Sequence, residues 1–208
     1  MSIDHIEFFV EEESMEIFLQ TLIPKLLGNI LYAIYPFQGK RELLALLPDR
    51  LRGYARMNEQ NGCVIVLIDR DNDDCQTLKA VLEQIAMDVG LVTKSSQGMN
   101  SRFQVINRIA IEELEAWYFG DWSAVRSAYP EVPPSIPTNS KYTDPDAIQG
   151  GTEEALERIF RRAGYHRSGL RKIEAAREIA PHIDPNRNTS KSFQVFRDAI
   201  QGLVSNLE

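Results

Sequence analysis

The 208-residue chain has few cysteines and no long apolar run. No apolar segment approaches the ~20 residues that a helix needs to cross a bilayer, so no membrane-spanning helix is expected. The N-terminus has no basic stretch followed by an apolar one, so no signal peptide is expected. Two cysteines, Cys63 and Cys75, indicate reduced thiols and not a disulfide framework. These features predict a cytoplasmic protein that does not contact the membrane.

Common catalytic motifs are missing as well. The chain contains no G-x-x-x-x-G-K-[ST] sequence, and its serines and cysteines form no nucleophile motif. An EF-hand loop beginning at Asp69 would need Gly and Glu where the chain has Asp74 and Ala80. The histidines are too scattered to suggest a zinc site: His5, His166 and His182.

Charge is distributed unevenly along the chain. The net charge is −7, which argues against non-specific binding of polyanions. Residues 1–140 hold 12 basic and 20 acidic side chains, whereas residues 141–208 hold 11 and 10. One basic stretch contains no acid and could follow a phosphate backbone, or could be a solvated helix face. Its members are Arg158, Arg161, Arg162, Arg167, Arg171 and Lys172.

The segment 64–74, VIVLIDRDNDD, is the most informative stretch of the sequence. Its five leading apolar residues are typical of a strand that is buried on both faces of a parallel sheet. The acidic residues then follow at the carboxyl end of the strand, where open α/β sheets bind ligands. Four carboxylates within six residues repel one another unless they are solvated or bind a cation such as Mg²⁺.

Strands and helices are expected to alternate, which predicts an α/β fold with a mainly parallel sheet of about four strands. Ser14 is the expected N-cap of the first helix, and Pro48 is expected to kink or break the second. Strands are expected at about 3–10, 30–36, 63–68, 91–93 and 103–111, and helices at about 15–27, 41–57, 74–89 and from Glu112 to 129.

We expect an α/β core over residues 1–130 and a proline-rich connector over 131–151. A helical extension packed on the core is expected over 152–208. Its helices should lie at about 152–163, capped by Thr152, and at about 168–180 and 190–206.

Acidic residues follow three of the expected strands, and the carboxyl ends of parallel strands lie at one edge of a sheet. The D-x-D spacing should place Asp69 and Asp71 on the same side of an extended segment. Taken singly, each group could instead be a solvated turn, with Asp73 as an N-cap, or a negative helix start. The three groups are Glu11; Asp69 and Asp71; and Glu112, Glu113 and Glu115.

Two motifs carry a family resemblance. The segment VEEESMEIF at 10–18 resembles the first motif of Toprim domains, and LIDRDNDD at 67–74 resembles the second. Toprim domains occur in topoisomerases, primases and OLD-family nucleases, so the resemblance implies Mg²⁺ or Mn²⁺ and phosphoryl transfer on nucleic acid. It implies that Glu11 is a general acid/base and that Asp69 and Asp71 bind metal.

Further segments resemble an uncharacterised bacterial domain-of-unknown-function family with a Toprim-like fold: FQGKRELL (37–44), IAIEELEAWYFGD (109–121) and KSFQVF (191–196). That resemblance implies Glu115 as the third acid and an ABC-type ATPase partner, as in anti-phage or repair systems. One departure is Glu12, where the first Toprim motif has glycine. If the backbone needs a positive φ there, Glu12 should be strained.

The leading functional hypothesis is a metal-dependent nuclease. Glu11, Asp69, Asp71 and Glu115 would bind the metal, with Glu11 also a candidate acid/base. Lys40 at a helix start could meet a phosphate, or could be a solvated lysine. The alternatives are an interaction subunit with weak or no catalysis, and a phosphohydrolase for small substrates. A haloacid-type phosphatase, which also begins with D-x-D after a strand, stays open.

Overall fold

The computed structural model describes residues 3–57, 61–98 and 102–204. Four parallel strands form one sheet, as the sequence predicted, and the structure gives their order as β2-β1-β3-β4. The β-branched and aromatic residues of these segments suit a pleated, buried surface. The strands are β1 His5–Val10, β2 Leu31–Pro36, β3 Gly62–Asp69 and β4 Val105–Ala110.

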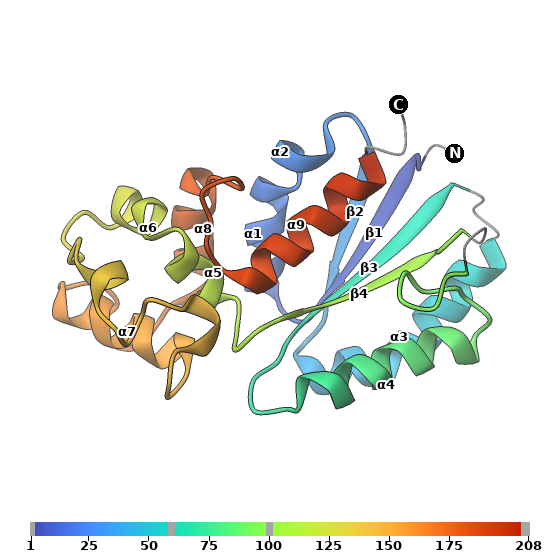
Figure 1. The fold of residues 1–208 in the computed structure, drawn as a ribbon, viewed down its shortest axis with the longest axis horizontal. Coiled ribbons are helices and arrows are strands. Elements are labelled where there is room, and N and C mark those ends of the chain that lie inside the picture. The colour runs from blue at the N-terminus through green and yellow to red at the C-terminus, as the bar shows by residue number, and fades with distance from the viewer. Residues whose placement is uncertain (1–2, 58–60, 99–101, 205–208) are drawn as a thin grey trace.

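Helices cover both faces of the sheet and extend beyond one end of it. Figure 1 shows α3 and α4 on one face, α1, α2 and α9 on the other, and α6, α7 and α8 grouped past the end. The α-helices are α1 Glu13–Leu22, α2 Pro24–Leu27, α3 Lys40–Met57, α4 Cys75–Asp88, α5 Glu115–Gly120, α6 Trp122–Ala128, α7 Thr152–Arg162, α8 Lys172–Ile179 and α9 Lys191–Val204. Three 3-10 turns span η1 Ile136–Thr138, η2 Pro145–Ala147 and η3 Ala180–His182.

The predicted α/β class, with flanking helices and C-terminal helices, is confirmed. The division of the chain at residues 130 and 152 stays a prediction. Within the described ranges, no helix combines the length and the apolar character needed to cross a membrane.

Strand β3 is buried along its whole length, as its apolar run predicted. Successive side chains of a strand point to opposite faces. Cys63, Ile65 and Leu67 therefore join the core beneath α1 and α9, whereas Val64, Val66 and Ile68 join the core beneath α3 and α4. The acidic segment thus begins where the most protected strand of the sheet ends.

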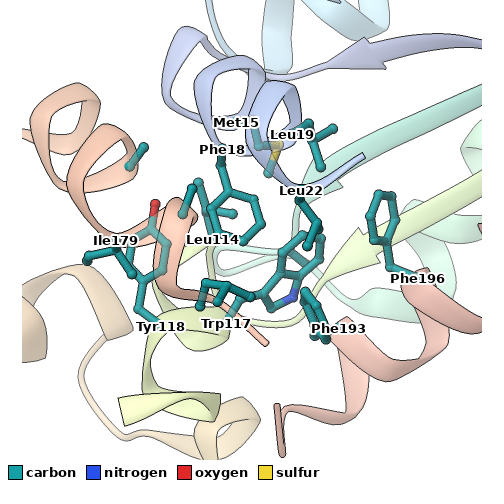
Figure 2. Close-up of a cluster of buried hydrophobic side chains, with 14 of the residues drawn as sticks. Met15, Phe18, Leu19, Leu22, Leu114, Trp117, Tyr118, Ile179, Phe193 and Phe196 are labelled. Atoms are coloured by element: carbon teal, nitrogen blue, oxygen red, sulfur yellow. The ribbon is translucent and has the colours of Figure 1, made fainter. Parts of the chain in front are cut away.

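Trp117 lies at the centre of the larger core (Figure 2). Its ring centroid is 5.7 Å from that of Phe18, 5.2 Å from Phe193 and 5.1 Å from Phe196. Its indole nitrogen donates a hydrogen bond to Oγ of Ser192 over 3.0 Å, which satisfies the only polar atom of the ring. This packing joins α1, α5 and α9, and so sets where α5 begins relative to the sheet.

Two expectations about the first helix are wrong. The predicted helix over 15–27 is divided into α1 and α2, because Pro24 has no N–H to donate and begins a new helix instead. Ser14 lies inside α1, and Glu12 occupies the N-cap position.

Three other expectations also differ from the structure. Helix α3 continues through Pro48 without a break, because Leu43, Leu47 and Leu51 on both sides of the proline are fully buried on one face. The expected strand at 91–93 is a single bridge between Thr93 and Val105. The helix expected from Glu112 begins at Glu115 as α5 and restarts as α6.

Candidate functional site

Three buried carboxylates lie at the carboxyl edge of the sheet, and we call Glu11, Asp69 and Glu115 the acidic edge. Glu11 follows β1, Asp69 ends β3, and Glu115 begins α5 shortly after β4. Their exposed fractions are 9%, 3% and 1%. The backbone N–H of Asp69 donates a hydrogen bond to Oε2 of Glu11 over 3.0 Å. The parallel topology therefore gathers acids that are far apart in the sequence.

The carboxylates of the acidic edge are poorly satisfied. Oδ1 of Asp69 and both carboxylate oxygens of Glu115 are buried without a hydrogen-bond partner. Burial raises the pKa of Asp69 well above its usual range, and the charges of Glu11 and Glu115 raise it further. Burial likewise raises the pKa of Glu115 to about 8. Unpartnered buried oxygens are costly, and they mark a place where a cation would be stabilised.

Asp69 and Asp71 do not share an extended segment, contrary to the D-x-D expectation. Strand β3 ends at Asp69, and Asp71 has a φ of 49°. Asp71 is exposed and its Oδ2 lies 2.7 Å from Nζ of Lys40. Its charge still raises the pKa of Glu11, after the larger effect of burial. Asp71 therefore lies at the rim of the acidic edge.

Lys40 is held at this rim and is not a freely solvated lysine. Its Nζ lies 2.7 Å from Oδ2 of Asp73 and donates to the carbonyl oxygen of Arg70 over 3.0 Å. The N-cap of α4 is Asp74 and not Asp73, because Asp74 accepts the N–H of Thr77 over 2.8 Å. Lys40 thus fastens the start of α3 to the loop that follows β3.

The other two acids after β4 have structural partners. Glu112 pairs with the guanidinium of Arg70. Oε2 of Glu113 accepts hydrogen bonds from Oγ1 of Thr152 over 2.9 Å and from the N–H of Glu153 over 2.8 Å. Thr152 was expected to be the N-cap of α7, and this expectation is wrong. Thr152 begins the helix, and the N-cap position is Gly151. Glu113 caps α7 from a distance, so Glu115 alone among these acids is left without partners.

Glu12 is not strained. Its φ of −149° and ψ of 169° are those of an extended backbone, which any residue adopts, so the expectation of strain at this position is wrong. Its carboxylate lies 2.8 Å from Nζ of Lys172 and accepts a hydrogen bond from the hydroxyl of Ser14. The side chain of Glu12 therefore has specific partners in Lys172 and Ser14.

Lys172 lies near the acidic edge, whereas the sequence predicted it only as part of the basic stretch. It begins α8, which packs on α1, and it extends to the acidic edge from there. Burial lowers the pKa of its amine, but the charge of Glu115, together with Glu12 and Asp69, raises it overall. The sequence placed Lys172 in a basic stretch, and no local pattern could have revealed partners so far away along the chain.

The rest of the basic stretch is spread over different surroundings. Arg158 and Arg162 line a cavity beside the 140–149 segment. Arg161 pairs with Glu157, and Arg171 pairs with Glu174 over 2.8 Å. Arg167 donates to a carbonyl oxygen within its own turn. Binding of nucleic acid by these residues stays a prediction.

A groove of about 500 Å³ adjoins the acidic edge. Glu12 and Lys172 line it together with Gln38 and Gly39, which precede α3. The N–H of Gly39 donates to the carbonyl oxygen of Glu11 over 2.9 Å, and this bond positions the groove against the end of β1. The groove therefore lies beside the acidic edge, although Glu11, Asp69 and Glu115 do not themselves line it.

The donor atoms suit a hard divalent cation, because Mg²⁺ and Mn²⁺ take carboxylate oxygens and keep several waters. Three such oxygens are buried and unpartnered at the acidic edge. As the side chains stand, no three Asp, Glu, His or Cys residues within 3–57, 61–98 and 102–204 are close enough to hold one ion. Binding of one ion by three of these residues would therefore need their carboxylates to move closer together.

Comparison with known proteins gives a family but no activity. A search of curated proteins finds no match to the chain. The C-terminal region of the OLD protein of Xanthomonas campestris pv. campestris has a TM-score of 0.49 and 13% identity, covering 99% of this chain and 95% of that chain. A likeness of this degree does not extend to activity. The family model described as "Domain of unknown function (DUF4276)" matches residues 10–203, nearly the whole chain, so the protein belongs to that family.

Proposed function

We propose that this protein is a Mg²⁺- or Mn²⁺-dependent nuclease that hydrolyses phosphodiester bonds. The observation that supports this most strongly is the pair of buried carboxylates, Asp69 and Glu115, with unpartnered oxygens beside Glu11. Buried acids with raised pKa values in such a place are a mark of functional sites. The proposed setting is the cytoplasm, in an anti-phage or repair system that includes an ABC-type ATPase.

Each residue has a role in this proposal. Asp69, Glu115 and Glu11 would hold the metal, with Asp71 contributing from the rim. A metal held there would supply a coordinated water of lowered pKa and positive charge beside the phosphate. Glu11 is also placed to transfer a proton, because it lies beside Asp69 and burial raises its pKa above the usual value. Lys40 and Lys172 flank the carboxylates and can donate to phosphate oxygens.

The test is cleavage of plasmid DNA and of short DNA and RNA single strands in Mg²⁺ or Mn²⁺. We expect Asp69→Asn and Glu115→Gln to lower the rate by about 100-fold or more, since even residues that only support metal ligands cost 10- to 100-fold. The matched control is Asp49→Asn, because Asp49 is 76% exposed on α3 and pairs with Arg52, away from the acidic edge. Circular dichroism would establish that each variant is folded. Cleavage that survives Asp69→Asn would overturn the assignment.

A second candidate is an interaction subunit that binds the ATPase without cutting. It is favoured by the lysines, because Lys40 pairs with Asp71 and Asp73, and Lys172 pairs with Glu12. These pairs balance acidic charge without a metal. Formation of an ATPase complex that never cleaves, with either metal, would favour this candidate. Hydrolysis of small phosphate esters that depends on Asp69 would instead indicate a phosphohydrolase for a small substrate.

A further inference from the structure

A second cavity lies between α7 and the segment that precedes it, away from the acidic edge. Its volume is about 560 Å³, within the range of small-molecule sites. Arg158 and Arg162 contribute from α7, and Lys141 and Tyr142 contribute from the segment between η1 and η2. None of the acidic-edge residues lines it. The cavity is therefore a separate site with its own chemistry.

The charge of this cavity has one sign. Three cations line it and no carboxylate does, in a chain whose net charge is −7. Within the described part of the chain, the side chains of Lys141, Arg158 and Arg162 make no hydrogen bond or ion pair. By contrast, Arg161 on the same helix pairs with Glu157. Arg158 and Arg162 are four residues apart, so they share one face of α7. Like charges that line one cavity favour an anion there.

An aromatic stack adds a second element of recognition. The ring of Tyr142 stacks on Phe119, with centroids 5.5 Å apart and planes 14° apart. Phe119 stacks in turn on Trp122, with centroids 5.4 Å apart and planes 20° apart. Phe119 and Trp122 are buried, whereas Tyr142 is half-buried and ends the stack at the cavity. A ring fixed in this way beside cations is suited to a base as well as a phosphate.

We propose that this cavity binds a nucleoside phosphate, either as a free nucleotide or as the 5′-phosphorylated end of a nucleic acid. The two guanidinium groups match phosphate oxygens in pairs of hydrogen bonds, and Tyr142 lies beside the base. The site does not depend on the proposed nuclease activity. The two sites are separated along α7. Glu153 lies 3.5 Å from Lys172 near the acidic edge, and Arg158 and Arg162 follow it by about 8 and 14 Å along the helix axis.

The experiment uses the full chain in EDTA, so that no metal-dependent cutting occurs. Calorimetry would compare AMP, adenosine and inorganic phosphate, and fluorescence anisotropy would compare short single strands with a 5′-phosphate or a 5′-hydroxyl. AMP is expected to bind at least about tenfold more tightly than adenosine. Tighter binding of the 5′-phosphorylated strand would show that the ligand is the end of a nucleic acid. Equal binding of the two strands, with AMP still bound, would show that the ligand is a free nucleotide.

The double variant Arg158→Gln/Arg162→Gln should weaken AMP binding by about tenfold or more. The matched control is Arg126→Gln/Arg177→Gln, which removes the same charge from exposed arginines that do not line the cavity. Lys141→Gln is a second cavity variant, outside any helix, in case the double variant does not fold.

Asp69→Asn should leave AMP binding unchanged, so failure of the nuclease proposal would not be mistaken for failure of this one. Equal binding of AMP and adenosine would overturn the proposal. So would an equal loss of affinity in the cavity variant and in its control.

Discussion

The backbone N–H of Asp69 donates a hydrogen bond to a carboxylate oxygen of Glu11, 3.0 Å away. This bond links the ends of β1 and β3 and fixes the direction of the Glu11 side chain. It also holds two acidic side chains next to each other in a buried place, where their charges repel. The metal-free site is therefore less stable than it would be with one acid neutralised.

Asp69→Asn should stabilise the protein in EDTA and remove its response to metal. Loss of a buried charge should raise the free energy of unfolding by about 1 kcal/mol, or a melting temperature by about 2–4 °C. Mg²⁺ at 100 times its Kd should stabilise the wild type by about 2.7 kcal/mol and leave the variant unchanged. Thermal unfolding with and without Mg²⁺ measures both effects. Asp49→Asn should respond to metal as the wild type does; equal stabilisation of all three proteins would contradict the site.

Lys172→Met should destabilise the protein by about 1–3 kcal/mol, because it removes the positive charge that acts on Glu115, Glu12 and Asp69. Adding Glu115→Gln should recover part of this loss, with a coupling energy of about 0.5–3 kcal/mol. Urea unfolding of the wild type, both single variants and the double variant gives the coupling energy directly. The exposed Asp49–Arg52 pair is the comparison and should couple by less than about 1 kcal/mol. If the changes in unfolding free energy caused by Lys172→Met and Glu115→Gln simply add, the lysine does not balance this carboxylate.

Asp71→Gly and Asp71→Ala should differ in stability because the φ of Asp71 is 49°. Both variants lose the carboxylate and its contact with Lys40, so only the backbone preference separates them. Glycine adopts this conformation without strain, and alanine does not. The Gly variant should therefore be the more stable by about 0.5–1 kcal/mol in urea unfolding. A more stable Ala variant would mean that residues 69–71 are extended after all, with both aspartates on one side.

Asp121 should make stability fall in acid. Its buried carboxylate accepts hydrogen bonds from Nε and a terminal nitrogen of Arg187, 2.8 and 2.9 Å away. Burial alone would raise its pKa, but these bonds and the N–H of Asp184 hold it below the usual 3.8. The unfolded chain then binds the proton first as pH falls, so this stabilisation is complete above pH 3.8 and is lost as pH falls through the lower folded value.

The measurement is urea unfolding between pH 2 and pH 6. Asp121→Asn should have a flatter stability profile below pH 4 than the wild type, with lower stability near neutrality. Parallel profiles for the two proteins would mean that another carboxylate accounts for the acid sensitivity.

Much of the fold could be predicted because the relevant signals are local. The apolar run at 63–68 can be satisfied only by burial on both faces, and alternation of strands with helices leads to a parallel sheet. That topology brought Glu11, Asp69 and Glu115 to one edge without any knowledge of contacts. The break at Pro24 was missed because a proline can begin a helix as readily as end one.

The sequence by itself determined the sheet and which strand ends carry acids, since side-chain period and chain order are properties of the sequence alone. The tertiary structure decided which acids are available. Glu112 and Glu113 are taken up by Arg70 and the start of α7, whereas Glu115 keeps both oxygens unpartnered. It also brought Lys172 to Glu12, because α8 packs on α1. Such pairings depend on packing between distant segments, which no local pattern encodes.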